Sequence, residues 1–178
     1  IIDFSSDGLI ANLTDRLGHY DNKDLWIADL NRHLYKNKLP LDPDILETFI
    51  LNVQGEVVAS SNPLHVGLKR PYADYFTGAK KEDVCVTGLH KCIDAEEPVI
   101  EVSRLLTNRK SGKSQSVGVI VNRVKGSSIA NLFINDITGK ESDLASSSNL
   151  STYVINNNNL VVAGSNVHMD KMLEMTIN

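Results

Sequence analysis

The chain has 178 residues, of which 42% are hydrophobic and 22% charged, with a formal net charge of −4. This composition excludes a disordered or fibrous chain, and the net negative charge gives no basic patch for nucleic acid. No stretch approaches the roughly 18–20 apolar residues that span a bilayer, and no signal peptide is visible. Because the first residue is Ile, we expect a fragment whose membrane anchors lie outside it.

The N-terminal 40 residues are predicted to be helical. Apolar residues recur at helical spacing from Leu9 to Leu34, which is typical of an amphipathic helix. Asp21, followed by Asp24, resembles an N-cap with an acidic first turn, so the segment is either one long helix or two helices. Its apolar residues either pack only against the rest of the chain or also contact a partner subunit.

The middle of the chain changes to the pattern of β-strands. Apolar, β-branched runs at 48–53 and 56–60, joined by Gln54-Gly55, predict a hairpin. We expect a short helix or turn at 71–79 and three further strands at 84–87, 99–106 and 116–124. This order favours one mostly antiparallel sheet in an α+β domain.

An internal repeat links the middle of the chain to its C-terminal part. Residues 50–62 align without gaps on residues 154–166, and six of the thirteen positions are identical, including the final Ser-Asn. Any two hairpins share some apolar positions, but the shared Ser-Asn favours a duplication. The first copy needs residues up to about 124 to complete its sheet, so we expect the second module to be incomplete.

Several of these segments carry a family pattern. The pattern consists of Leu51–Ser61, Gly67, Tyr75-Phe76 with Ala79, Glu97–Ser103 and Gly118-Val119-Ile120. In this order and spacing they resemble the double Cache (PDC) sensor domains of bacterial histidine kinases, chemotaxis receptors and diguanylate cyclases.

The resemblance implies a long N-terminal helix, a PAS-like module with a five-stranded antiparallel sheet, and a second PAS-like module that is incomplete here. The expected boundaries are 1–40 for the helical segment, 41–126 for the membrane-distal module and 127–178 for the start of the membrane-proximal module. The family binds a small ligand in the distal module, between the sheet and the segment that bears the Tyr-Phe pair.

The ligand chemistry implied by the resemblance departs from the amino-acid-binding branch of the family. That branch uses an Arg-x-Trp-Tyr motif and an Asp on the last strand, where this chain has Ala73-Asp74-Tyr75-Phe76 and Arg123. Arg123 either points into the pocket, where it would suit a carboxylate or other oxyanion, or lies on the solvent face beside an acidic neighbour. Tyr75 and Phe76 are either ligand contacts or core residues. The candidate ligand-binding residues are Arg70, Tyr72, Tyr75, Phe76, Ser103 and Arg123.

No catalytic or cofactor motif is present, so we expect neither an enzyme nor a cofactor. His90 lies near Cys85, Cys92 and Asp94, but the spacing matches no standard zinc site. The two cysteines either close a small loop by a disulfide in an oxidising compartment or remain ordinary thiols.

The sequence therefore predicts the periplasmic ligand-sensing domain of a cell-membrane receptor, foremost a sensor histidine kinase. Its expected partners are a small molecule, for which a carboxylate or other anion is the candidate, and a second copy bound through the N-terminal helix. Membrane contact would come only through flanking transmembrane helices, and no nucleic acid is expected. The alternative is a cytoplasmic PAS-type interaction or cofactor-binding module.

Overall fold

The fold was examined in a computed structural model, which describes residues 8–17, 23–110, 113–128, 131–132, 153–156, 158–164 and 171–176. The chain divides into two compact units. Unit 1 combines Ile1–Thr87 with Glu101–Val124, and unit 2 combines Gly88–Ile100 with Lys125–Asn178. Among the described residues, no helix is both long and apolar enough to cross a bilayer.

Of the two N-terminal arrangements open from the sequence, the structure has separate helices. These are α2 (Gly8–Leu17) and α3 (Lys23–His33), which contact each other. Helix α3 continues through a π-helical turn, Leu34–Lys38, and a 3₁₀ turn, Leu39–Leu41. The helical region ends around Pro40, since proline cannot continue the hydrogen-bond ladder.

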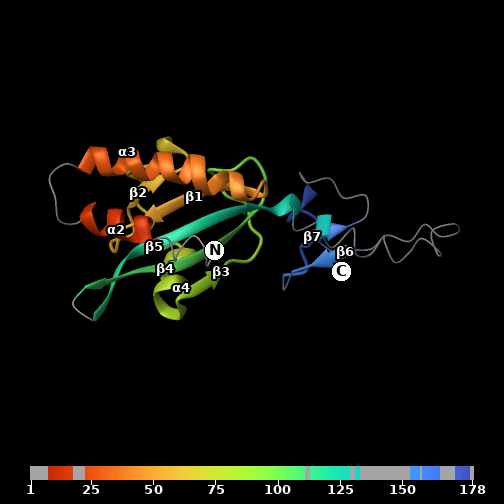
Figure 1. Ribbon diagram of the computed structural model, residues 1–178. Helices are drawn as coiled ribbons and strands as arrows, with labels where there is room; N and C mark the ends of the chain where they lie inside the picture. Colours follow the sequence, from red (N-terminus) through yellow and green to blue (C-terminus); the bar gives the residue numbers. More distant parts are fainter. Residues whose placement is uncertain are drawn as a thin grey trace, which may run out of the picture. The chain divides into compact units, whose positions relative to one another are not determined.

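Unit 1 is built on the predicted antiparallel sheet (Figure 1). Its strands lie in the order β2-β1-β5-β4-β3, so the first and last strands of the module are neighbours at its centre. The bounds are β1 Ile45–Leu51, β2 Val57–Ser60, β3 Val84–Val86, β4 Val99–Lys110 and β5 Lys113–Lys125. A short 3₁₀ turn, Pro63–His65, follows β2, and α4 (Asp74–Glu82) precedes β3.

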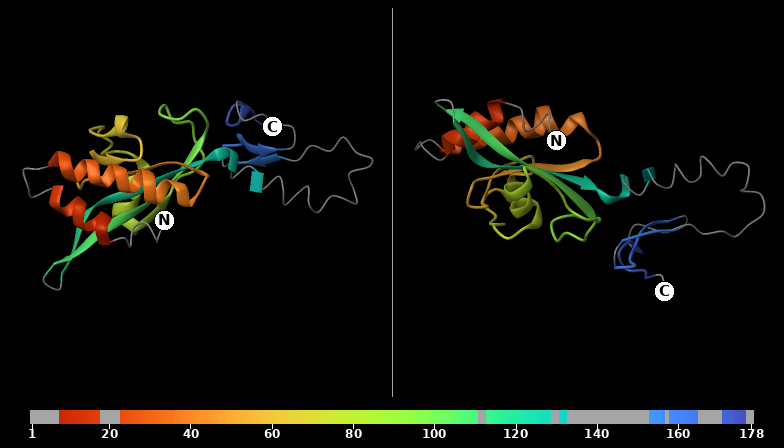
Figure 2. Two further views of the ribbon diagram at one scale, coloured as in Figure 1. Left: turned by 45° about the horizontal axis from the view of Figure 1, so that its top comes forward. Right: turned by 90° about the horizontal axis from the view of Figure 1, so that it is seen from below.

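Helices cover both faces of this sheet. Figure 2 shows α2 and α3 on one face and α4 on the other. The α2/α3 face is an aliphatic core that includes Ile10, Leu13, Leu30, Leu34, Ile50 and Ile120. The α4 face carries a smaller cluster of Phe49, Leu51, Val57, Tyr75, Phe76, Ala79, Val119 and Val121.

Unit 2 contains a two-stranded sheet, β6 (Tyr153–Ile155) and β7 (Val161–Gly164), that repeats the β1–β2 hairpin. In the first hairpin Ile50 pairs with Ala59 and Leu51 with Val57, with a register shift between the two pairs. In the second, Val154 pairs with Ala163 and Ile155 with Val161, with the shift at the same place. The two hairpins therefore share one register.

The turns of the two hairpins are also alike. The side-chain oxygen of Asn52 accepts the N–H groups of the second and fourth residues after it, each at 3.0 Å. Asn156 does the same at 2.9 and 3.0 Å. Gly55 has a φ of 81°, and its counterpart Asn159 has a φ of 59°, a conformation that glycine and asparagine tolerate best. The sequence repeat is thus also a structural repeat.

The likeness extends beyond the residues that align. After β2 the chain returns, so that the N–H of Val57 donates to Leu68 O at 2.8 Å. After β7 it returns in the same way, and the N–H of Val161 donates to Met175 O at 2.9 Å. This return could not be predicted from the sequence, because the two returning segments differ in length and composition.

Candidate functional site

The α4 face of the sheet is the face that the family resemblance marks for a ligand. Alternation along β1 directs Glu47, Phe49 and Leu51 to this face, because successive side chains of a strand point to opposite sides. On β5, Val119, Val121 and Arg123 share it. The part of this face beneath α4 is therefore apolar, and the part where Glu47 pairs with Arg123 is charged.

A buried ionic network occupies the charged end of this face. The guanidinium of Arg123 donates from Nη1 to Glu47 Oε2 at 2.8 Å and from Nε to Glu101 Oε1 at 3.4 Å. The three side chains are only 5%, 6% and 1% exposed, respectively. Arg123 also lies over the ring of Phe49, with its Cζ 5.4 Å from the ring centroid. Two buried carboxylates therefore share one buried cation.

Neighbouring segments complete the hydrogen bonds of the two carboxylates. Glu47 Oε1 accepts from Ser60 Oγ at 2.6 Å and from His65 Nδ1 at 2.7 Å. Glu101 Oε2 accepts from Thr87 Oγ1 at 3.1 Å. The network therefore ties β1, β2, the turn after β2, β4 and β5 together. Buried charges need such partners, since an uncompensated one is costly in a low-dielectric interior.

Helix α4 is held over the sheet by three contacts. Ser103 Oγ donates to the carbonyl of Tyr75 at 2.7 Å. A side chain at Gly55 would lie 2.6 Å from Pro71 Cα and 3.2 Å from the ring of Phe76, so the β1–β2 turn packs directly on the segment that leads into α4. The rings of Phe49 and Tyr75 meet edge to face, with centroids 5.7 Å apart.

The six candidate residues from the sequence fall into three groups. Arg123 faces α4 rather than solvent, and Ser103 lies on the same face, where it bonds to α4. Tyr75 and Phe76 are buried in the core cluster beneath α4. Tyr72 is 91% exposed, and Arg70 is half-buried in the segment before α4. The structure thus brings four of the six to one face.

Sequence reasoning missed Glu47, Glu101, His65 and Thr87. A signal was present for the two glutamates. Glu47 interrupts the alternating apolar residues of β1, and Glu101 lies between the strand positions Val99 and Ser103. A charged residue at an inward position of a strand is uncommon and calls for a partner. His65 and Thr87 lie outside regular strands, and no local pattern marks them.

The cysteines are both free thiols, so the disulfide that the sequence left open is not formed in this structure. Cys85 Sγ packs against Gly78 of α4 and lies 3.7 Å from the carbonyl of Asp74, so it is directed at α4 within unit 1. Cys92 belongs to unit 2. Burial raises the pKa of the Cys85 thiol, and the carboxylates of Glu82 and Asp74 raise it further.

Among the described residues, no group of three His, Cys, Asp or Glu side chains is arranged to hold a metal ion. At the α4 face, the carboxylates of Glu47 and Glu101 are both hydrogen-bonded to Arg123. What the face offers is a set of fixed, buried hydrogen-bonding groups beside an aromatic cluster.

No protein-family model and no curated protein matches this chain. Solved structures do match. The sensor domain of the V. cholerae histidine kinase DctB has a TM-score of 0.62 and 14% identity, and the match covers 92% of this chain and 56% of that one. The ligand-binding domain of the Campylobacter jejuni chemoreceptor Tlp3, in complex with 4-methylisoleucine, has a TM-score of 0.56 and 16% identity, covering 93% and 63%.

A third match is the ligand-binding domain of the Pseudomonas aeruginosa amino acid chemoreceptor PctC in complex with GABA, with a TM-score of 0.51 and 14% identity. It covers 93% of this chain and 69% of that one. The chain therefore spans less than two thirds of the DctB and Tlp3 domains. At these identities the likeness concerns the fold: this chain has the fold of the Cache/PDC-type sensor domains of bacterial histidine kinases and chemoreceptors.

Proposed function

We propose that this chain is the ligand-sensing part of the extracytoplasmic region of a bacterial transmembrane receptor. The observation that carries the proposal is the sheet of unit 1, with terminal helices on one face and a buried polar network beside α4 on the other. This sheet belongs to a fold shared with the DctB sensor domain and the Tlp3 ligand-binding domain. A small molecule would bind at the α4 face.

The arrangement suits transmission of a binding event to the N-terminal helices. Ile50 and Ile120, on β1 and β5, pack in the same core cluster as Leu13 of α2 and Leu34 of the π-helical turn after α3. The other sides of β1 and β5 carry Glu47 and Arg123. A ligand that displaces these two strands therefore acts on the packing of the helices. The response is a population shift, limited by the difference in ligand affinity between the two states.

The charges of the network bear on the ligand. Arg123 already has two carboxylate partners, so an anionic ligand would compete with both of them. A ligand with an ammonium group would instead add a cation to a site that holds two carboxylates and one guanidinium. Because the two buried carboxylates of Glu47 and Glu101 both contact Arg123, we favour an amine-bearing ligand over the carboxylate suggested by Arg123 alone.

A thermal-shift screen of the 178-residue chain against amines, carboxylates and amino acids tests the proposal. A ligand at 100 times its Kd should stabilise the fold by about 2.7 kcal/mol, a shift of several degrees. We expect hits among amine-bearing compounds, weakened by Glu101→Gln and unaffected by the matched surface change Glu82→Gln. If only carboxylates bind, the result would favour the alternative in which Arg123 binds an anionic ligand. The absence of any hit would contradict the sensing function.

The location of the domain is a separate question. In the full-length receptor, alkaline phosphatase fused within this domain should be active, because that enzyme folds only where its disulfides form. An inactive fusion, with an active fluorescent-protein fusion at the same site, would place the domain in the cytoplasm. That outcome would favour the alternative of a cytoplasmic PAS-type module.

A further inference from the structure

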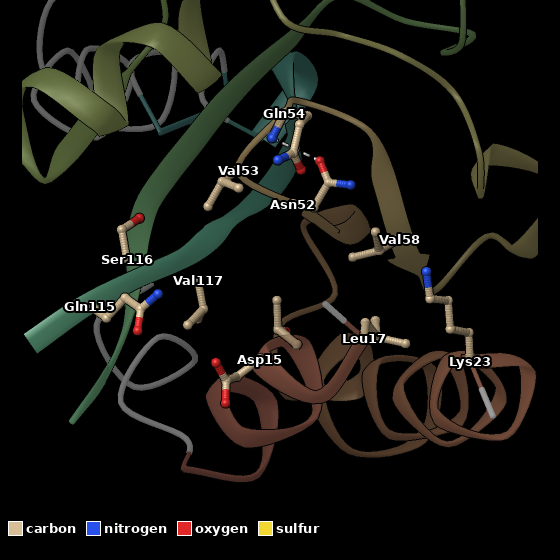
Figure 3. A pocket seen from close by; sticks show the side chains of 11 residues that line it. Asp15, Leu17, Lys23, Asn52, Val53, Gln54, Val58, Gln115, Ser116 and Val117 are labelled. Carbon is tan, nitrogen blue, oxygen red and sulfur yellow. Dashed lines mark hydrogen bonds between the residues drawn. The ribbon is translucent and has the colours of Figure 1, made fainter. Parts of the chain in front are cut away.

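A pocket of about 410 Å³ lies on the side of the sheet opposite α4 (Figure 3). It is formed by α2, the start of α3, the β1–β2 turn and the beginning of β5. Its volume falls within the range of small-molecule sites, about 300–1,000 Å³. The sheet separates it from the Arg123 network, because Val117 packs in the α2/α3 cluster whereas Arg123 lies over Phe49 of the α4-face cluster.

The walls of the pocket are polar at the rim and apolar at the floor. Leu17, Val58 and Val117 supply the apolar surface. In Figure 3, Asp15 lies at one end near Gln115, and Lys23 lies at the other end. The pocket thus presents an acidic group and a basic group across an apolar floor.

The two charged groups differ in their surroundings. Asp15 is 7% exposed and accepts a hydrogen bond from Asn108 Nδ2 at 3.4 Å, so its carboxylate is held in place. Lys23 is exposed at the first position of α3. A buried, positioned carboxylate contributes more to recognition than an exposed ammonium, whose interactions water screens.

We propose that this pocket is a second ligand site, which takes a small linear zwitterion. The ammonium group of the ligand lies at Asp15, its carboxylate lies at Lys23, and its methylene chain covers Leu17 and Val117. The side-chain amides of Gln54 and Gln115 supply further hydrogen bonds to either end. The pocket lining does not include Glu47, Glu101 or Arg123, so the two sites can be tested separately.

An occupant of this pocket would touch both α2 and the sheet. Thr14, next to Asp15 on α2, packs where β5 carries Gly118. A side chain at Gly118 would collide with the carbonyl of Leu51 and lie 3.3 Å from Thr14 Cγ2, so the glycine allows α2 to rest on the sheet. A ligand bridging Asp15 and the sheet therefore binds the docked helix best. It should slow hydrogen exchange at α2 amides.

Isothermal titration of the 178-residue chain with ω-amino acids, from β-alanine to 6-aminohexanoate, tests the site. We expect one chain length to bind best, and n-butylamine and butyrate, which each lack one charge, to bind weakly. Asp15→Asn should weaken binding about tenfold or more, and Lys23→Gln about threefold. The matched surface variants Lys36→Gln and Lys81→Gln, both exposed and outside the pocket, should bind as the unmodified chain does.

The proposal is overturned if no chain length binds, or if Asp15→Asn and Lys23→Gln both bind unchanged. Loss of binding in Glu101→Gln instead of Asp15→Asn would assign the zwitterion to the α4 face and also overturn it. If circular dichroism shows that Asp15→Asn does not fold, Lys23→Gln and the two singly charged analogues decide the matter. Exchange at α2 amides that is unchanged by a bound ω-amino acid would likewise contradict the site.

Discussion

Replacing Arg123 with methionine isolates the energetic role of the buried network. Methionine keeps an unbranched stem beside Phe49 but removes the guanidinium that Glu47 and Glu101 share. Both carboxylates would remain at positions where their side chains are 6% and 1% exposed. Breaking a buried ion pair by removing one partner costs about 3–5 kcal/mol. That loss is a large fraction of the about 5–15 kcal/mol that stabilises a typical domain.

Urea denaturation followed by circular dichroism measures this loss. Arg104→Met is the matched control on the adjacent strand, because Arg104 pairs with Asp83 at 3.2 Å while both are partly exposed, 27% and 54%. That variant should lose no more than about 1 kcal/mol. Adding Glu47→Gln and Glu101→Gln to Arg123→Met should restore at least half of the loss, since the uncompensated charges are then gone. An Arg123→Met variant that loses less than about 1 kcal/mol would refute the reasoning.

Three further predictions concern other parts of the chain. Gly118→Ala should destabilise unit 1 by about 1–3 kcal/mol in urea denaturation, because its methyl group would collide with the carbonyl of Leu51 beneath α2. An unchanged urea midpoint would show that α2 and β1 move apart to accept the methyl group without loss of stability. In a Cys92→Ser background, alkylation of Cys85 should have its midpoint at a higher pH in the folded than in the denatured chain. The raised pKa keeps this thiol protonated through the neutral range, and coinciding midpoints would be inconsistent with that burial. Asn52→Ala should lower the free energy of unfolding by about 1–2 kcal/mol. Asn156→Ala should speed hydrogen exchange at the two backbone amides that donate to its side chain. Exchange rates equal to those of the unmodified chain would argue that the two turns are not equivalent.

Most of the fold could be predicted from local patterns. The hairpin around Gln54-Gly55 and the later strands follow from alternation and turn chemistry, which act over a few residues. The repeat was visible because six of thirteen positions are identical; at one of them, Asn52 and Asn156 make the same hydrogen bonds in the two turns. The division of the N-terminal segment into α2 and α3 was left open, because a possible N-cap at Asp21 does not by itself end the preceding helix.

The site was harder to predict, because its contacts are long-range. Whether Arg123 faces inward depends on the register of β5 against β1, where it pairs with Glu47. A shift of one residue would have placed Asn122 there instead. Once Arg123 is inward, its partners come from strands far away in the sequence, so the sequence suggested an anion site where the structure has an acid-rich network. The exposure of Tyr72 likewise depends on how the segment before α4 packs.

The central claim is that a small molecule binds at the α4 face of unit 1. The most direct measurement is a ¹H–¹⁵N NMR titration of the 178-residue chain with the tightest ligand from the thermal-shift screen. The account predicts that the largest shift changes fall on the Arg123 Nε–H and on the backbone amides of Glu47 and Glu101. Changes confined to residues outside the α4 face, with the Arg123 Nε–H unmoved at saturation, would contradict it.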